Sequence, residues 1–220
     1  MSQIKERPIL FSAPMVCAIL DGRKTVTRRP LNAQALKNIG YGVQLGECHE
    51  LPSEGPLHPN SVGYYNDFCP LGQIGDRLYV RETFNRTNPG GAEGVYYYRA
   101  DGEFPKSIGG GKFTDAESWK PSIHMPREAS RILLEITDVR VERLQDISEA
   151  QAMAEGIVGV PFRPDDGWPI CTGYMVGPDD GKSALETTAA KAFAGLWNST
   201  GGDWDANPWV WVVEFKRVQP

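Results

Sequence analysis

The segment Trp209–Val218 constrains the fold of this chain more than any other stretch. It contains no glycine or proline, and large apolar side chains occupy every second position, which is the spacing of one face of a β-strand. Asn207-Pro208 breaks the chain just before it. The segment therefore predicts a closing β-strand. The side chains of its apolar face are Trp209, Trp211, Val213 and Phe215.

The rest of the chain predicts a mixed set of elements. The pattern gives about six strands and three short helices, joined by links of hairpin length. Strands do not alternate regularly with crossover helices, which argues against a doubly wound parallel sheet. We therefore expect a mixed α+β fold, in which a small mixed or antiparallel β-barrel carries helices on its outside. The other predicted strands are 8–11, 24–29, 78–83, 95–99 and 130–143, and the predicted helices are 14–21, 149–155 and 184–197.

A length of 220 residues favours a single domain. Three stretches, 31–74, 101–118 and 159–183, show no sustained periodicity and are rich in glycine and proline. We predict that 1–220 forms one domain and that these stretches are loop insertions in it.

Charge narrows the classes of partner. The net charge is -5, which argues against nucleic-acid binding over the whole surface. Residues 1–30 hold six basic and two acidic side chains, a balance of +4, so the other 190 residues sum to -9. This local basic patch suits a small anionic ligand or one stretch of RNA, and an ordinary solvated face explains it equally well.

No apolar run approaches the ~20 residues of a membrane helix, and the N-terminus is a poor secretory signal. We expect a cytoplasmic protein with no membrane partner and no obligate protein partner. Cys48, His49 and Cys69 lack the usual zinc spacing, and the three histidines are scattered. We therefore predict no metal and no cofactor.

The segment 20–29 concentrates chemically useful side chains. It offers two hydroxyls, one lysine and three arginines. On a regular strand Lys24 and Thr27 would face opposite sides, so they converge only if Lys24 lies in the turn that Gly22 permits. Glu82, at the end of another predicted strand, is the second element of interest.

These residues resemble a known family. The pattern G-x-K-x-x-T-x-R, at Gly22, Lys24, Thr27 and Arg29, is typical of ASCH domains in the PUA-like superfamily. The whole chain resembles the larger members encoded by phages or prophages. The supporting segments are Gly75–Glu82, the helix motif at 147–156, WKPSIHMPREASR at 119–131 and the closing strand from Asn207.

The resemblance implies a small β-barrel suspected of binding RNA. In one compact bacterial branch of the family, a Lys, a Thr three residues later and a downstream Glu remove the acetyl group from N4-acetylcytidine. These positions fall on Lys24, Thr27 and Glu82. This chain is much longer than that branch, because of its three insertions.

The chemistry is coherent in its own right. Thr27 can serve as a nucleophile and Lys24 as its base, if burial or neighbouring arginines lower the pKa of that lysine. Glu82 can protonate the leaving nitrogen. The alternative is a structural Lys24–Glu82 ion pair beside an ordinary strand threonine. Arg28 or Arg29 can stabilise an oxyanion or hold a phosphate, and the other predicted substrate-binding residues are Arg23, Arg81, His124 and Arg127.

Three functions follow, in order of preference. The first is an amidohydrolase that acts on an N-acylated nucleoside such as N4-acetylcytidine. The second is a non-catalytic RNA- or nucleotide-binding module of the PUA-like type. A metal-dependent ribonuclease is a distant third, because no cluster of carboxylates or histidines is visible.

Overall fold

The structure is a computed structural model. It describes residues 3–87, 94–102, 107–108, 111–112, 119–164, 167, 169–178 and 181–219. Within these ranges, no helix is both long enough and apolar enough to cross a membrane.

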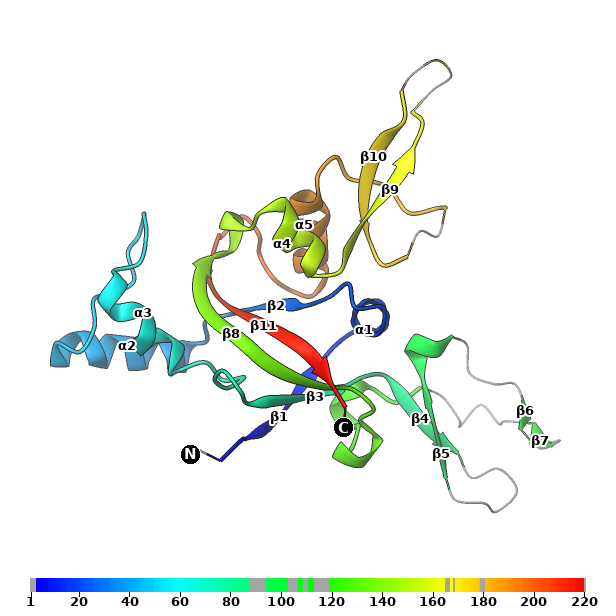
Figure 1. Cartoon of the computed structure of the whole chain (residues 1–220), viewed down its shortest axis with the longest axis horizontal. Helices are drawn as coiled ribbons and strands as arrows, with labels where there is room; N and C mark the ends of the chain where they lie inside the picture. Colours follow the sequence, from blue (N-terminus) through cyan, green and yellow to red (C-terminus); the bar gives the residue numbers. More distant parts are fainter. Residues whose placement is uncertain are drawn as a thin grey trace.

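A five-stranded sheet forms the centre of the molecule (Figure 1). Its strand order is β1-β3-β8-β11-β2; β1 and β3 run parallel, and the other neighbours are antiparallel. The longest ladder joins β8 and β11, with a register shift between Glu214 and Phe215. The strands are β1 (Glu6–Leu10), β2 (Val26–Pro30), β3 (Arg77–Arg81), β8 (Leu133–Arg143) and β11 (Trp209–Val218).

The two edges of this sheet, β1 and β2, do not pair with each other in the described part of the chain. The prediction of a mixed α+β fold is confirmed. The predicted closed barrel is not what the strand pairing gives, because the sheet remains open between β1 and β2. The end of β1 nevertheless comes close to β2, since Arg29 donates a hydrogen bond of 3.0 Å to the Leu10 carbonyl.

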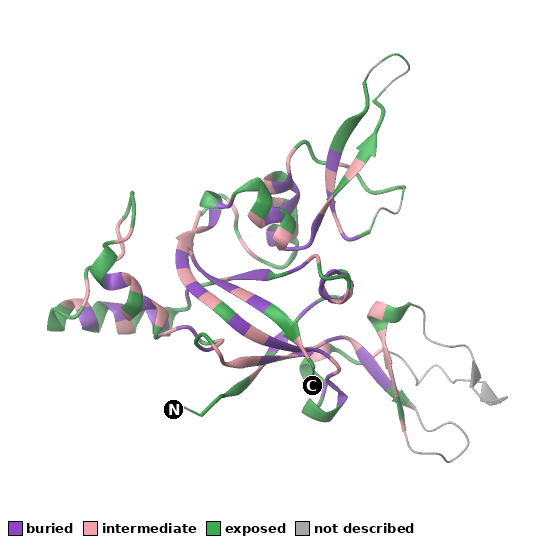
Figure 2. Ribbon diagram, viewed as in Figure 1, coloured by how far each residue is buried: buried purple, intermediate pink, exposed green. Residues whose placement is uncertain are grey.

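Two apolar cores pack against the two faces of the sheet, and β11 contributes to both. Trp211, Val213 and Phe215 enter the core that also holds residues of α1, α2 and α3. Val210 and Val212 enter the core formed with α4 and α5. Figure 2 shows buried positions recurring along β8 and β11. The helices are α1 (Ala13–Leu20), α2 (Ala33–Leu45), α3 (Pro59–Asn66), α4 (Glu149–Ala154) and α5 (Ala189–Ser199).

The prediction that 31–74 is an irregular insertion is wrong, because this stretch contains α2 and α3. Asn32 caps α2 by accepting a hydrogen bond from the Ala35 N–H. Glycines inside α2 obscured its periodicity. One of them is needed for packing, since a Cβ at Gly42 would collide with the Tyr64 ring of the neighbouring α3.

The stretch 159–183 is also more regular than predicted. It contains most of an antiparallel hairpin, β9 (Ile157–Phe162) with β10 (Cys171–Val176). The last helix begins at Ala189 rather than at 184, because Thr188 caps it and Glu186 forms a β-bridge to Tyr174. The predicted insertion at 101–118 lies mostly outside the described residues.

The smaller elements complete the chain. The remaining strands are β4 (Phe84–Thr87), β5 (Val95–Tyr98), β6 (Ser107–Ile108) and β7 (Gly111–Lys112). The short 3-10 helices are η2 (Arg99–Asp101), η3 (Ser122–His124), η4 (Arg127–Ala129) and η5 (Leu144–Asp146).

Gly156 is the tightest packing point between α4 and the N-terminal segment. Its φ is +105°, and a Cβ there would lie 3.2 Å from the Ala18 Cβ and 3.7 Å from the Lys24 Cβ. We expect Gly156→Ala to lower the free energy of unfolding by about 1–3 kcal/mol, measured by urea denaturation. Gly63→Ala is the matched control. Gly63 is a helical residue with open space around it, so that change should not destabilise the protein. Equal effects of the two changes would contradict this account.

Candidate functional site

The turn between α1 and β2 is fixed by backbone hydrogen bonds. Gly22 has a φ of +73°, and the N–H groups of Arg23 and Lys24 both bond to the Ala18 carbonyl, at 2.8 and 2.9 Å. The Thr25 N–H bonds to the Ala154 carbonyl at 2.9 Å. Lys24 therefore lies before the strand, which meets the condition for its convergence with Thr27, and the predicted strand 24–29 begins only at Val26. The segment that holds Lys24 is bound to the ends of α1 and α4.

Lys24 is buried, with 3% of its surface exposed. Its ammonium donates to the Val26 carbonyl at 2.8 Å, to the Glu155 carbonyl at 2.9 Å and to Glu155 Oε2 at 2.6 Å. These three bonds use all the donors of a lysine. Burial lowers the pKa of Lys24, and the Glu155 charge opposes this shift only in part.

Glu155 is the partner that the sequence analysis missed. It lies at the C-terminal cap of α4, and its side chain is 4% exposed. Arg28 is fully buried and bridges two carboxylates, Glu155 at 3.3 Å and Glu142 at 3.2 Å. A carboxylate at a helix C-terminus is opposed by the helix dipole. Its position just before Gly156 was therefore a signal that it needs cationic partners.

These side chains meet in a cavity of about 110 Å³. The cavity lies between the residues that end and follow β1, the strand β2 and the helix α5. Thr27, which is 1% exposed, lines it together with Lys24 and Glu155. The cavity therefore occupies the opening between the two edges of the sheet. Its full lining is Leu10, Phe11, Ser12, Met15, Lys24, Thr27, Arg28, Arg29, Glu155, Phe193, Leu196, Trp197 and Thr200.

Glu82 is not among the residues that line this cavity, so the structure does not bring it together with Lys24 and Thr27 there. Its carboxylate is buried and accepts two hydrogen bonds from Arg131, at 2.9 and 3.1 Å. Burial raises the pKa of Glu82 despite Arg131. The alternative interpretation of a Lys24–Glu82 ion pair is not what the structure shows. Lys24 pairs with Glu155, and Glu82 pairs with Arg131.

The two arginines of β2 both line the cavity but have different hydrogen-bond partners. Arg29 donates to the carbonyls of Leu10 and Arg28, and its guanidinium lies 5.5 Å from the Phe11 ring. Burial lowers the pKa of Arg29. Arg28 has a buried Nε without a hydrogen-bond partner among the described residues. Arg28 therefore holds a buried donor that no described residue satisfies.

The other predicted binding residues lie outside the cavity. Arg23 pairs with Asp21 at 2.9 Å, and Arg127 pairs with Glu6 at 3.0 Å. These two arginines therefore serve surface ion pairs.

Arg81 donates to the Met125 carbonyl at 2.8 Å and to the Ile123 carbonyl, which fixes η3 against β3. His124 lies in η3 and is exposed. Neither residue lines the cavity.

The cysteine and histidine residues considered for zinc are placed apart from this site. Cys48 donates a 3.6 Å hydrogen bond to the Ile39 carbonyl, and the His49 ring stacks on His58 with centroids 3.8 Å apart. Across the described ranges, no group of three or more His, Cys, Asp or Glu side chains could hold a metal ion.

No protein-family model, no curated protein and no solved structure matches this chain.

Proposed function

We propose that this protein hydrolyses the amide of an N-acylated nucleoside such as N4-acetylcytidine. The observation that supports this most is the buried Lys24–Glu155 pair, 2.6 Å apart, in the cavity that Thr27 also lines. The substrate class comes from the resemblance carried by Gly22, Lys24, Thr27 and Arg29. We also propose that the open sheet is a variant of the PUA-like barrel, with this cavity in its seam.

The Lys24–Glu155 pair can carry one proton at either end. Because burial disfavours two separated charges, a proton can pass from the ammonium to the carboxylate across the 2.6 Å contact. This transfer leaves a neutral amine that can act as a base and a neutral carboxylic acid that can act as an acid. Glu155 thereby takes the role that the sequence analysis gave to Glu82.

The reaction then uses the residues of the cavity in sequence. Thr27 Oγ1 attacks the acyl carbon, and its proton passes to Lys24 Nζ. The carbon–nitrogen bond breaks, and the leaving nitrogen takes a proton from Glu155. Water then hydrolyses the Thr27 ester, which releases the carboxylic acid and regenerates the Thr27 hydroxyl, while the pair keeps its one proton, now on Lys24. In this proposal Arg28 or Arg29, which both line the cavity, stabilises the oxyanion.

The non-catalytic binding module is less well supported by this geometry. A phosphate needs cations with free donors. In this cavity the carboxylates of Glu155 and Glu142 pair with Lys24 and Arg28. The third cation, Arg29, donates to the carbonyls of Leu10 and Arg28. Three buried donors directed at carbonyls and a carboxylate suit proton transfer better than anion capture.

The test is to incubate the purified protein with N4-acyl cytidines, N6-acyl adenosines and Nε-acyl lysine, and to follow the products by chromatography. We expect free nucleoside and carboxylic acid from an acylated nucleoside. RNA binding, measured in parallel, tests the alternative. If no compound is hydrolysed and RNA binds with strong salt dependence, the binding module is the correct function.

The dependence of the rate on pH follows from the shared proton. With two protons on the pair, Lys24 cannot accept one from Thr27; with none, Glu155 cannot donate. We therefore expect a bell-shaped profile of kcat/KM, whose two limbs belong to the pair. Burial lowers the pKa of Lys24, so the alkaline limb should fall below the pH at which an exposed lysine titrates. A rate that rises steadily through that range would contradict the assignment.

A further inference from the structure

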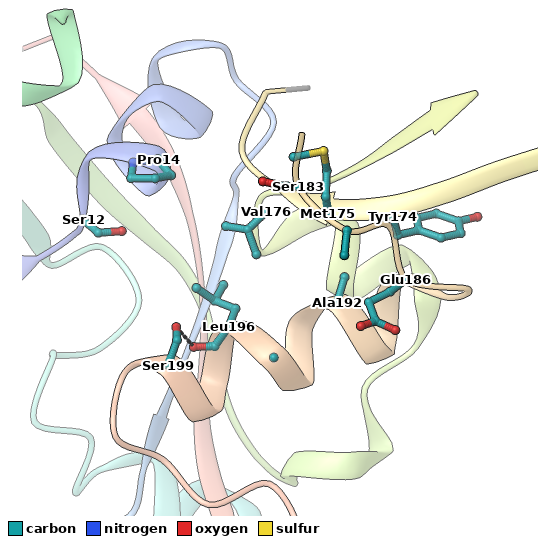
Figure 3. A pocket seen from close by; sticks show the side chains of 12 residues that line it. Ser12, Pro14, Tyr174, Met175, Val176, Ser183, Glu186, Ala192, Leu196 and Ser199 are labelled. Atoms are coloured by element: carbon teal, nitrogen blue, oxygen red, sulfur yellow. Dashed lines mark hydrogen bonds between the residues drawn. The ribbon is translucent and has the colours of Figure 1, made fainter. Parts of the chain in front are cut away.

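A second, larger pocket adjoins the cavity that holds Lys24 and Thr27. It has a volume of about 460 Å³ and shares Ser12 and Leu196 with the smaller cavity. Its walls come from the start of α1, from β10, from the segment after β10 and from α5. Figure 3 shows the side chains that surround it. The hairpin β9–β10 and the segment that follows thus build a pocket beside the reactive residues.

The volumes of the two spaces indicate that each can hold a different part of one substrate. Pockets that hold whole small molecules measure about 300–1,000 Å³. The inner cavity, at about 110 Å³, holds only the reacting group, while the outer pocket is large enough for the rest of a nucleoside. Because the two spaces share Ser12 and Leu196, they are neighbours in the fold.

The outer pocket combines apolar and polar side chains, and its described lining offers no cation. The hydroxyls of Ser12 and Ser199 and the carboxylate of Glu186 line it, and its described lining contains no Lys, Arg or His. Lys182, next to Ser183 in the chain, is exposed and is not part of the lining. Glu186 is held by backbone hydrogen bonds of 2.9 and 2.8 Å to Tyr174, and its side chain is exposed.

We propose that this pocket holds the sugar of an uncharged nucleoside, with Glu186 accepting hydrogen bonds from sugar hydroxyls, and that it rejects nucleotides. A carboxylate is a suitable acceptor for ribose hydroxyls, whereas it repels a phosphate that no cation neutralises. This inference rests on the proposed function, and it adds that Glu186 and the absence of a cation in this pocket exclude the phosphorylated forms of that nucleoside.

The experiment measures kcat/KM for N4-acetylcytidine and for its 5′-phosphate. We expect the wild type to prefer the uncharged nucleoside by at least ~10-fold, which corresponds to about 1.4 kcal/mol. Glu186→Gln should reduce this preference, and Glu186→Lys should abolish or reverse it. Glu54→Lys is the matched control. It makes the same charge change at an exposed residue of a separate hollow, so it should leave the preference intact.

Binding of cytidine and cytidine 5′-monophosphate by calorimetry separates this inference from the proposed function. Tighter binding of cytidine, with a difference that Glu186→Lys removes, supports the inference even if no amide is hydrolysed. Equal or tighter binding of the monophosphate by the wild type overturns it, and so does the absence of binding by either compound. An unchanged preference in Glu186→Lys also overturns it.

Discussion

Lys24→Met is expected to reduce kcat/KM for N4-acetylcytidine by at least ~10²-fold, because the variant has no group that can take the proton of Thr27. Methionine keeps most of the length of the side chain and removes the amine. Lys37→Met, at an exposed lysine of α2, is the control and should keep full activity. A Lys24→Met enzyme with the wild-type rate would show that the base is another group.

The loss of activity in Lys24→Met must be distinguished from a loss of folded protein. Removing Lys24 leaves the buried Glu155 carboxylate with Arg28 as its remaining cation, which costs stability on the order of 3 kcal/mol. The double variant Lys24→Met/Glu155→Gln also removes the carboxylate charge that lost its lysine, and it should recover part of the stability. Its activity should stay as low as that of the single variant. Activity that returned with stability would assign Lys24 a structural role.

The second prediction with a large expected effect concerns which of two buried glutamates, Glu155 or Glu82, is the acid. We expect Glu155→Gln to lower kcat/KM by at least ~10²-fold, because an amide cannot protonate the leaving nitrogen. Glu82→Gln is the matched control. Both carboxylates are buried and paired with a cation, but only Glu155 lines the cavity. Glu82→Gln should therefore change the rate by less than ~3-fold while it weakens the contact with Arg131.

The opposite pattern would be equally informative. If Glu82→Gln abolished the reaction and Glu155→Gln did not, the original assignment of the acid to Glu82 would be restored. Thermal denaturation of both variants, measured alongside, shows whether either loss reflects unfolding. Comparable melting temperatures are required before the two rates are compared.

Local patterns in the sequence predicted the elements that carry this site. The alternation in Trp209–Val218 correctly identified β11. Gly22 permitted the turn before β2, although the predicted strand started two residues too early, at Lys24. The helix motif at 147–156 correctly predicted α4, whose capping box joins Ser148 and Gln151.

Tertiary contacts explain what the sequence could not predict. Glu155 is 131 residues from Lys24, and the two meet only because Thr25 bonds to the Ala154 carbonyl and Gly156 allows close approach. The apolar periodicity of α4 cannot predict this contact between Lys24 and Glu155. Glu82 was attractive as an acid next to apolar and basic neighbours, but its partner Arg131 comes from a segment 49 residues away.

The most direct test of the account is the formation of cytidine and acetate from N4-acetylcytidine by the wild type and by Thr27→Val. Valine keeps the shape of the buried threonine and removes only the hydroxyl. We predict steady turnover by the wild type and a rate at least ~10²-fold lower for Thr27→Val. A wild type that forms no cytidine, or a Thr27→Val variant as fast as the wild type, would contradict the assignment of this cavity as the catalytic site.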